Sequence, residues 1–338
     1  MPVAFLTGVA GQDGSYLAER LVADGWRVHG LVRPGHGPGR PHPAGVTLHN
    51  GDLADIDRVG DLISSLRPDE IYNLGGIASV AQSWQEPLPT ARASGLGAAG
   101  LLEAAWRLTQ AGHAVRVLQA SSAEIFGTPT ESPQDELTPI RPVSPYGAAK
   151  AFAHHLVGVY RGRGLAATSC ILYNHESPRR PTTYVTRKIS WAVAHIAAGQ
   201  QDTLRLGSLD TRRDWGWAPD YVAAMVRAVR HPESDDFVIA TGTAHSILDF
   251  VTASFARVGI VDWYRHVTLD PGLVRPADPA ELVGDAGKAR AVLDWRPTVS
   301  FDEIVERMVD TDRAELAAAE SAEPPAAGPP RRADHPAT

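Results

Sequence analysis

Cysteine, lysine and long apolar runs are all scarce in this 338-residue chain. The one cysteine, Cys170, excludes an internal disulfide and fits a reducing cytosol, and its apolar neighbours favour a buried strand position over a catalytic thiol. No stretch reaches the roughly 20 apolar residues of a membrane span. Residues 1–6 lack a basic region followed by a long apolar core, so we expect no signal peptide and a cytoplasmic protein.

Positive charge is also in short supply. The formal net charge of −7 and the pI near 6.0 argue against nucleic acid or an anionic membrane as the main partner. Only three of the 32 basic residues are lysines, so the places where lysines occur are informative. We expect no metal site. The composition, 43% hydrophobic, is that of an ordinary globular protein, and 338 residues are enough for one large or two smaller domains.

Short apolar runs alternate with helical patterns through the first half of the chain. The runs predict strands at residues 3–7, 27–32, 45–49, 70–74, 115–120 and 166–173, and helical spacing covers 56–66 and 91–109. Strands that alternate with helices indicate a parallel sheet with right-handed crossovers. We therefore predict an α/β fold with a Rossmann-type doubly wound sheet.

The second half has a looser pattern that is rich in Arg, Pro, Asp and Trp. A strand at 237–241, a helix at 246–258 and a capping box at Ser300–Glu303 suggest a smaller, mixed α/β lobe that binds the substrate. We place the nucleotide-binding domain mainly in 1–173 and the lobe mainly in 174–314, with the chain free to cross between them. Residues 315–338, rich in Ala, Glu and Pro, predict a disordered tail.

A glycine cluster follows the first predicted strand and opens a helix. Gly8, Gly11 and Gly14 allow the backbone of this loop, which also contains Gln12 and Asp13, to approach a pyrophosphate at the helix N-terminus. This context predicts a dinucleotide site.

The choice of dinucleotide depends on the end of the second strand, where an acidic residue is typical of NAD-binding folds. The chain has Arg33 there, which favours the 2′-phosphate of NADP, with Arg40 as a weaker second candidate. Asp52 and Leu53 follow the third strand and could face the adenine. Leu74 and Gly75 follow the fourth and could line the cofactor.

Tyr146 and Lys150 are four residues apart, so on a helix they share one face. A lysine ammonium near the tyrosine hydroxyl favours the phenolate, which can remove a hydroxyl proton while hydride leaves the same carbon for a nicotinamide. Ser122 lies just past the fifth strand, where its hydroxyl could bond the same substrate oxygen.

Glu124 separates two kinds of chemistry at this site. Oxidation and reduction at one carbon need no further carboxylate, whereas Glu124 could remove a proton alpha to the new ketone and so allow elimination of a neighbouring hydroxyl. An ordinary solvated glutamate at a strand end is the alternative.

Together these motifs resemble the GDP-mannose 4,6-dehydratases of the extended short-chain dehydrogenase/reductase family. The resemblance runs from Thr7 to about Asp312 and includes all three lysines. Its most specific segments are 8–16, 119–127, 172–180, 185–188, 209–216 and 239–242.

The resemblance implies roles for further residues. Lys150, His175 and Arg180 match cofactor-contacting positions. The positions that hold a nucleotide-sugar are matched by Asn174, Val185, Lys188, Arg213 and Arg275. The implied reaction oxidises C4 of GDP-mannose, eliminates water across C5 and C6 and returns the hydride to C6. A nucleotide-sugar epimerase or 4-ketoreductase, and a binding scaffold without catalysis, remain alternatives, and the base of the nucleotide stays open.

Two departures from the family pattern bear on these expectations. Ser122 stands where threonine is usual and keeps the hydroxyl. The loop after Arg33 is shorter and has Pro34 in place of a paired arginine, in a loop that in the family helps to assemble tetramers around the cofactor. We therefore expect a homo-oligomer and leave homodimer and homotetramer open.

Overall fold

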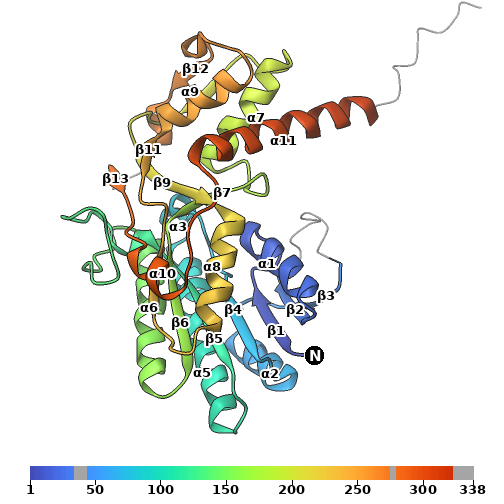
Figure 1. The fold of residues 1–338 in the computed structure, drawn as a ribbon, viewed down its shortest axis with the longest axis vertical. Coiled ribbons are helices and arrows are strands. Elements are labelled where there is room, and N and C mark those ends of the chain that lie inside the picture. The colour runs from blue at the N-terminus through green and yellow to red at the C-terminus, as the bar shows by residue number, and fades with distance from the viewer. Residues whose placement is uncertain (34–43, 275–278, 323–338) are drawn as a thin grey trace, which may run out of the picture.

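The computed structural model describes residues 1–33, 44–274 and 279–322. Its layered sheet carries helices on both faces, and a smaller lobe lies over one end of that sheet (Figure 1). Within the described residues, no helix combines the length and apolarity that crossing a membrane requires.

The central sheet has seven parallel strands and confirms the predicted fold class. Their spatial order is β10-β6-β5-β4-β1-β2-β3, which places the last three strands in sequence on one side of β4 and the first three on the other. The bounds are β1 Val3–Thr7, β2 Arg27–Val32, β3 Val46–Asn50, β4 Glu70–Asn73, β5 Arg116–Ser122, β6 Ala166–Leu172 and β10 Asp236–Ile239.

Two hydrophobic clusters cover the two faces of this sheet. Helices α1 (Gln12–Ala23), α8 (Ala218–Arg230) and α10 (Gly287–Val292) pack with Ala4 and Leu6 on one face. Helices α2 (Ile56–Leu66), α5 (Gly97–Gln110) and α6 (Pro145–Gly162) pack with Phe5 on the other. Because side chains alternate along a strand and both faces are covered, residues 3–6 of β1 are all apolar, and only Thr7 at its end is polar.

The smaller lobe is mixed α/β, as expected. Strand β9 pairs with antiparallel β11 and with parallel β7 and β13, and β8 pairs with β12. Helices α7, α9 and α11 bury a core of their own over this sheet. The bounds are β7 Asn174–Glu176, α7 Val185–Ala197, β8 Leu204–Leu206, β9 Arg212–Trp217, β11 Ala244–Ser246, α9 Ile247–Arg257, β12 Val267–Leu269, β13 Glu281–Leu282 and α11 Phe301–Ala322.

Short elements complete the described chain. They are α3 Val80–Gln85, α4 Pro87–Thr90, the π-helix η1 Ala91–Leu96, and the 3₁₀-helices η2 Ala123–Ile125, η3 Trp263–Arg265 and η4 Pro271–Leu273. The single helix predicted at 91–109 is therefore a π-turn followed by α5. The predicted capping box is present, since Ser300 and Glu303 exchange side-chain and backbone hydrogen bonds.

The chain crosses between the two parts, as the predicted boundaries allowed. After β9 it returns to the large sheet through α8 and β10, then goes back to the lobe. The tail prediction is wrong for residues 315–322, which continue α11. Ala and Glu are strong helix formers, so the composition that suggested disorder also extends a helix that is already anchored. The rest of the predicted tail lies outside the described residues.

Candidate functional site

The glycine loop between β1 and α1 is closely packed at the carboxyl edge of the sheet. Gly8 has φ +70, and a Cβ there would lie 2.9 Å from the Leu74 carbonyl carbon. A Cβ on Gly14 would lie 2.1 Å from the Gly8 carbonyl oxygen. The N-cap of α1 is Gly11, which has no side chain to accept a hydrogen bond from the first amides of the helix. This backbone cradle fits the diphosphate of a dinucleotide.

Asp13 and Gln12, in the first turn of α1, contact His175 of β7. The Asp13 carboxylate lies 2.9 Å from His175 Nε2, and Gln12 donates to the His175 backbone carbonyl. His175 Nδ1 donates to the Tyr173 carbonyl at 2.7 Å, so with Asp13 as acceptor both ring nitrogens carry protons. Burial disfavours the charged ring, but Asp13 outweighs it and the pKa of His175 is raised. Burial also opposes ionisation of Asp13, yet His175 holds the pKa of that carboxyl below its usual value.

A buried hydrogen-bond chain ties the ends of β1, β4 and β5 together. Thr7 Oγ1 donates to Asn73, Asn73 donates to Gln119, and the Gly75 amide donates to Thr7 Oγ1. Leu74 and Gly75 therefore lie beside the glycine loop, and their predicted contact with the cofactor stays a prediction. These bonds fix the separation of the three strand ends around the cradle.

Leu53, Asp52 and Arg33 follow β3 and β2 at the same edge. Leu53 is buried against Gly75 and Gly97, while the Asp52 carboxylate accepts the Ala54 amide at 2.9 Å. Arg33 is exposed directly after β2. Arg40, the second candidate for the 2′-phosphate, lies outside the described residues.

Tyr146 and Lys150 lie on the buried face of α6. The Lys150 ammonium donates to the Ala120 carbonyl at 2.9 Å and lies 5.8 Å from the centre of the Tyr146 ring. Burial lowers the pKa of Lys150 to about 8. Burial also raises the pKa of Tyr146, and a hydrogen bond from Ser122 and the charge of Arg180 only partly offset this. The chain therefore favours the neutral phenol until further positive charge is bound beside it.

Ser122 and Glu124 reach the same place from the end of β5. The Ser122 hydroxyl lies close enough to the Tyr146 phenol to lower its pKa, and it accepts the Glu124 amide at 3.3 Å as the cap of η2. Gly147, next to Tyr146, allows this approach, because a Cβ there would lie 2.5 Å from the Glu124 carbonyl oxygen. A hydroxyl, a phenol and a carboxylate-bearing turn thus meet at one point.

Arg180 lies near Tyr146 on the segment that follows β7. Its guanidinium pairs with Glu176 at 3.4 Å and stacks over the Tyr184 ring at 4.0 Å. Tyr184 and Arg180 both influence the Tyr146 phenol electrostatically, which places them around it. Sequence reasoning did not select Tyr184. Its position just before Val185, at the cap of α7, is the one signal that could have found it.

The remaining predicted substrate residues belong to the lobe. Asn174 begins β7 and Val185 begins α7, while Lys188 Nζ donates to the Arg205 carbonyl at 2.6 Å. Arg213 is buried, with its guanidinium on the Pro279 carbonyl at 2.8 Å. Arg275 lies outside the described residues, although Pro279 stands four positions after it.

One further residue supports Tyr146 and was missed by sequence reasoning. Ser83 of α3 is fully buried, and its hydroxyl accepts the Tyr146 backbone N–H at 3.1 Å. A lone serine in the stretch Val80–Gln85 carries no motif, so only the tertiary structure reveals this contact.

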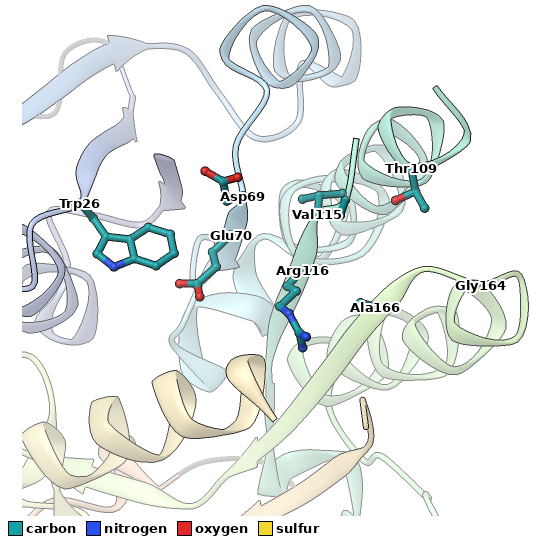
Figure 2. A pocket seen from close by; sticks show the side chains of 9 residues that line it. Trp26, Asp69, Glu70, Thr109, Val115, Arg116, Gly164 and Ala166 are labelled. Atoms are coloured by element: carbon teal, nitrogen blue, oxygen red, sulfur yellow. The ribbon is translucent and has the colours of Figure 1, made fainter. Parts of the chain in front are cut away.

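A cavity of about 420 Å³ lies at the opposite edge of the sheet (Figure 2). Its residues precede or begin strands: Trp26 before β2, Asp69 before β4, Val115 before β5 and Ala166 in β6. The charged groups there are already paired, since Arg230 bonds Glu70 and the Asp69 carboxylate accepts the Val3 amide. Ligands of doubly wound folds bind at the carboxyl ends of the strands, so this cavity is not the candidate active site.

Comparisons with known proteins agree with this geometry. Residues 5–308 match the family model described as GDP-mannose 4,6 dehydratase. GDP-mannose 4,6 dehydratase 1 of Arabidopsis thaliana is 42% identical over 92% of this chain and 89% of that protein. The human GDP-mannose 4,6 dehydratase is also 42% identical, over 92% of this chain and 91% of its own length.

A solved structure shares the fold as well. The UDP-glucose 4-epimerase of Thermus thermophilus, in complex with NAD, aligns with a TM-score of 0.80 and 29% identity over 92% of this chain and 99% of that one.

Proposed function

Because the chain belongs to the family of GDP-mannose 4,6-dehydratases, we propose that it converts GDP-mannose to GDP-4-dehydro-6-deoxy-mannose and water, with NADP as its cofactor. The observation that carries this proposal is the meeting of Tyr146, Ser122 and Glu124 at the end of β5, beside the glycine cradle. The cofactor would not be consumed, because its oxidation state is the same before and after the reaction. The net change is therefore the elimination of one water.

The cofactor fits the cradle for a reason visible in the chain. Gly8 and Gly14 leave no room for side chains between the loop and its neighbours, and the first turn of α1 presents amides to a diphosphate. Two groups of residues would contact the dinucleotide. Lys150, His175 and Arg180 would lie near its nicotinamide end. The residues that would surround the rest of it are Gly8, Gly11, Gln12, Asp13, Gly14, Asp52, Leu53, Leu74 and Gly75. When bound, the nicotinamide would supply reversible hydride acceptance for this reaction.

NADP in place of NAD is supported by Arg33. A guanidinium at the end of β2 can hold a 2′-phosphate bidentately, whereas the acidic residue that would bond a free ribose hydroxyl is absent there. The Thermus relative was solved with NAD, so a nicotinamide dinucleotide suits this fold in either form.

Tyr146 is the proposed base at the C4 hydroxyl. It removes that proton while Ser122 holds the same oxygen as it becomes a carbonyl. Since burial raises the pKa of Tyr146, the phenolate needs the positive charge of Lys150, Arg180 and the oxidised cofactor together.

Glu124 is the proposed base at C5. The C4 ketone acidifies the C5 proton, and Glu124 Oε removes that proton and passes it to the C6 hydroxyl, which leaves as water. The hydride equivalent taken from C4 is delivered to C6, and C5 gains a solvent-exchangeable proton that balances the one Tyr146 removed from the C4 hydroxyl. Atoms and electrons then balance, with one water lost.

The lobe residues Asn174, Val185, Lys188, Arg213 and Arg275 are the proposed contacts of the nucleotide-sugar. Cationic side chains suit its diphosphate. We also propose a cytoplasmic homodimer or homotetramer. Leu88, Phe152 and Val159 support self-association, because they expose apolar surface on α4 and α6, which pack together.

The function is tested by incubating the purified chain with GDP-mannose and NADP, and in parallel with other nucleotide-sugars. Mass spectrometry should show a product one water lighter from GDP-mannose and from no competitor. A product of unchanged mass would instead favour an epimerase, and one lighter by two hydrogens, from oxidation by NADP without elimination, a 4-ketoreductase running in reverse.

A further inference from the structure

Ser83 connects α3 to the residue that the proposed mechanism uses as base. Its hydroxyl donates to the Val80 carbonyl at 2.7 Å within α3 and accepts the backbone N–H of Tyr146 at 3.1 Å. The side chain is 0% exposed, so no water can replace it in either bond. One hydroxyl therefore fills a donor role and an acceptor role between two helices.

The first turn of α6 explains why Tyr146 needs an external acceptor. Amides in the first turn of a helix have no partner within that helix. The cap residue Ser144 accepts the Gly147 amide at 3.0 Å, and Pro145 has no amide hydrogen. The Tyr146 amide is buried and depends on Ser83. Leaving such a buried group unpaired would destabilise this turn, because its desolvation is then not compensated.

Tyr146 is thus held at two ends by different parts of the fold. Ser83 fixes its backbone from α3, and the Ser122 hydroxyl at the end of β5 lies beside its phenol. The Glu124 backbone packs against the same turn at Gly147, where the absence of a side chain allows the close approach. A shift of the α6 N-terminus along its axis would carry the phenol away from both Ser122 and Glu124.

Helix α3 also follows the segment that lines the cradle. Gly75 is bonded to Thr7 of β1, and residues 76–79 lead directly into α3. Gly76 is itself packed tightly, since a Cβ there would lie 2.6 Å from the buried Ser94 hydroxyl of η1. Ser83 therefore links the backbone of Tyr146 to the segment after β4, which is the segment proposed to face the cofactor.

We propose that Ser83 is a positioning residue for Tyr146, which sets the place of the phenol without touching substrate or cofactor. The inference rests on the proposed function, because that function makes Tyr146 the base. Its consequence is specific: loss of the Ser83 hydroxyl lowers the rate of the chemical step and leaves the affinity for NADP and for the nucleotide-sugar unchanged.

The test compares Ser83→Ala with the wild-type enzyme and with Ser65→Ala. Ser65 makes the same bond to a carbonyl three residues back in its own helix, at 2.9 Å, but it is exposed and contacts no other element through its hydroxyl. We measure kcat and KM for GDP-mannose, the Kd of NADPH by fluorescence, and hydrogen exchange at the Tyr146 amide.

For Ser83→Ala we expect kcat to fall at least about tenfold, KM and Kd to stay within about twofold, and the Tyr146 amide to exchange faster. Ser65→Ala should match the wild type throughout. If Ser83→Ala does not fold, Ser83→Cys, of nearly the same shape with a weak acceptor, replaces it with the same expectations.

Two results would overturn the proposal. One is a folded variant with wild-type kcat, and the other is an equal loss of kcat, of both affinities and of thermal stability, which would mark ordinary packing. Should the wild type fail to dehydrate GDP-mannose, the proposed function falls. Exchange at the Tyr146 amide then still decides the Ser83 contact, because unchanged exchange in the variant contradicts it.

Discussion

At the scale of single residues, the account depends on side chains whose environment changes their chemistry. Tyr146 is buried and therefore a weaker acid than a free tyrosine, so the site has to supply positive charge before the phenol can act as a base. Lys150 donates to the Ala120 carbonyl and contributes charge, not a direct bond to the phenol. Spacing on a helix predicted the shared face but could not predict these partners.

Glu124→Gln should keep the fold and the binding of NADPH and lose water elimination, because an amide cannot accept the C5 proton. The loss of general-base catalysis predicts a fall in kcat of roughly 10²–10⁴-fold. Product formation is followed by mass spectrometry and cofactor affinity by fluorescence. Glu131→Gln, on an exposed position of the following loop, is the matched control. Unaltered turnover in Glu124→Gln would remove this residue from the mechanism.

Arg33→Ser should weaken NADP binding by about 10–100-fold and change NAD binding little, since it removes charge-assisted hydrogen bonds to the 2′-phosphate. Titration of both cofactors measures the ratio of the two dissociation constants. The exposed Arg107, on α5, serves as a control in Arg107→Ser. Equal losses for both cofactors would show that Arg33 does not select between them.

The ion pair of Asp13 and His175 predicts a pH dependence of stability. The pKa of His175 is raised in the folded state, so its contribution is fully present below its unfolded pKa of about 6.5 and is lost as pH rises through the folded value. The pKa of Asp13 is lowered, so its contribution is present above about 3.8 and is lost as pH falls through the folded value.

Asp13→Asn should therefore be less stable than wild type near pH 6, and the gap should narrow as pH rises through the His175 pKa. Urea unfolding at a series of pH values from about 6 to 9 measures this. A gap that stays constant over that range would mean that His175 is not charged in the folded chain.

At the scale of elements, helix α11 shows what composition alone cannot reveal. The capping box at Ser300 predicted its first turn, whereas the buried ion pair that joins its middle to α7, between Arg187 and Asp312, was not predicted. Arg187 also donates to the Pro178 carbonyl in the segment that carries His175 and Arg180. Because that pair joins residues 125 positions apart, no local pattern predicts it.

Asp312→Asn should destabilise the chain by somewhat less than the roughly 3–5 kcal/mol of an uncompensated buried charge, because the buried Arg187 guanidinium keeps only the largely exposed Glu315 as an anionic partner. Denaturant unfolding measures the loss. Asp310→Asn is the matched control on the same helix, since it breaks a surface pair with Arg257 and should cost far less. Similar losses in both variants would contradict a buried, supporting role for Asp312.

At the scale of the whole molecule, the site lies where the large sheet and the lobe meet. The sheet was predictable because alternating strands and helices leave clear periods, and the glycine loop marked its cofactor edge. The lobe was harder, since its short strands β7, β9, β11 and β13 pair across long stretches of chain. Lys188 and Arg213 were selected only by resemblance, and the backbone carbonyls that they bond could not be foreseen.

The central claim, an internal redox elimination, is tested most directly with GDP-mannose carrying deuterium at C4. The account predicts a product one water lighter in which that deuterium sits on the C6 methyl group, while C5 carries a hydrogen from solvent. Nuclear magnetic resonance and mass spectrometry locate both atoms. Deuterium retained at C4, or a product that keeps its C6 hydroxyl, would contradict the account.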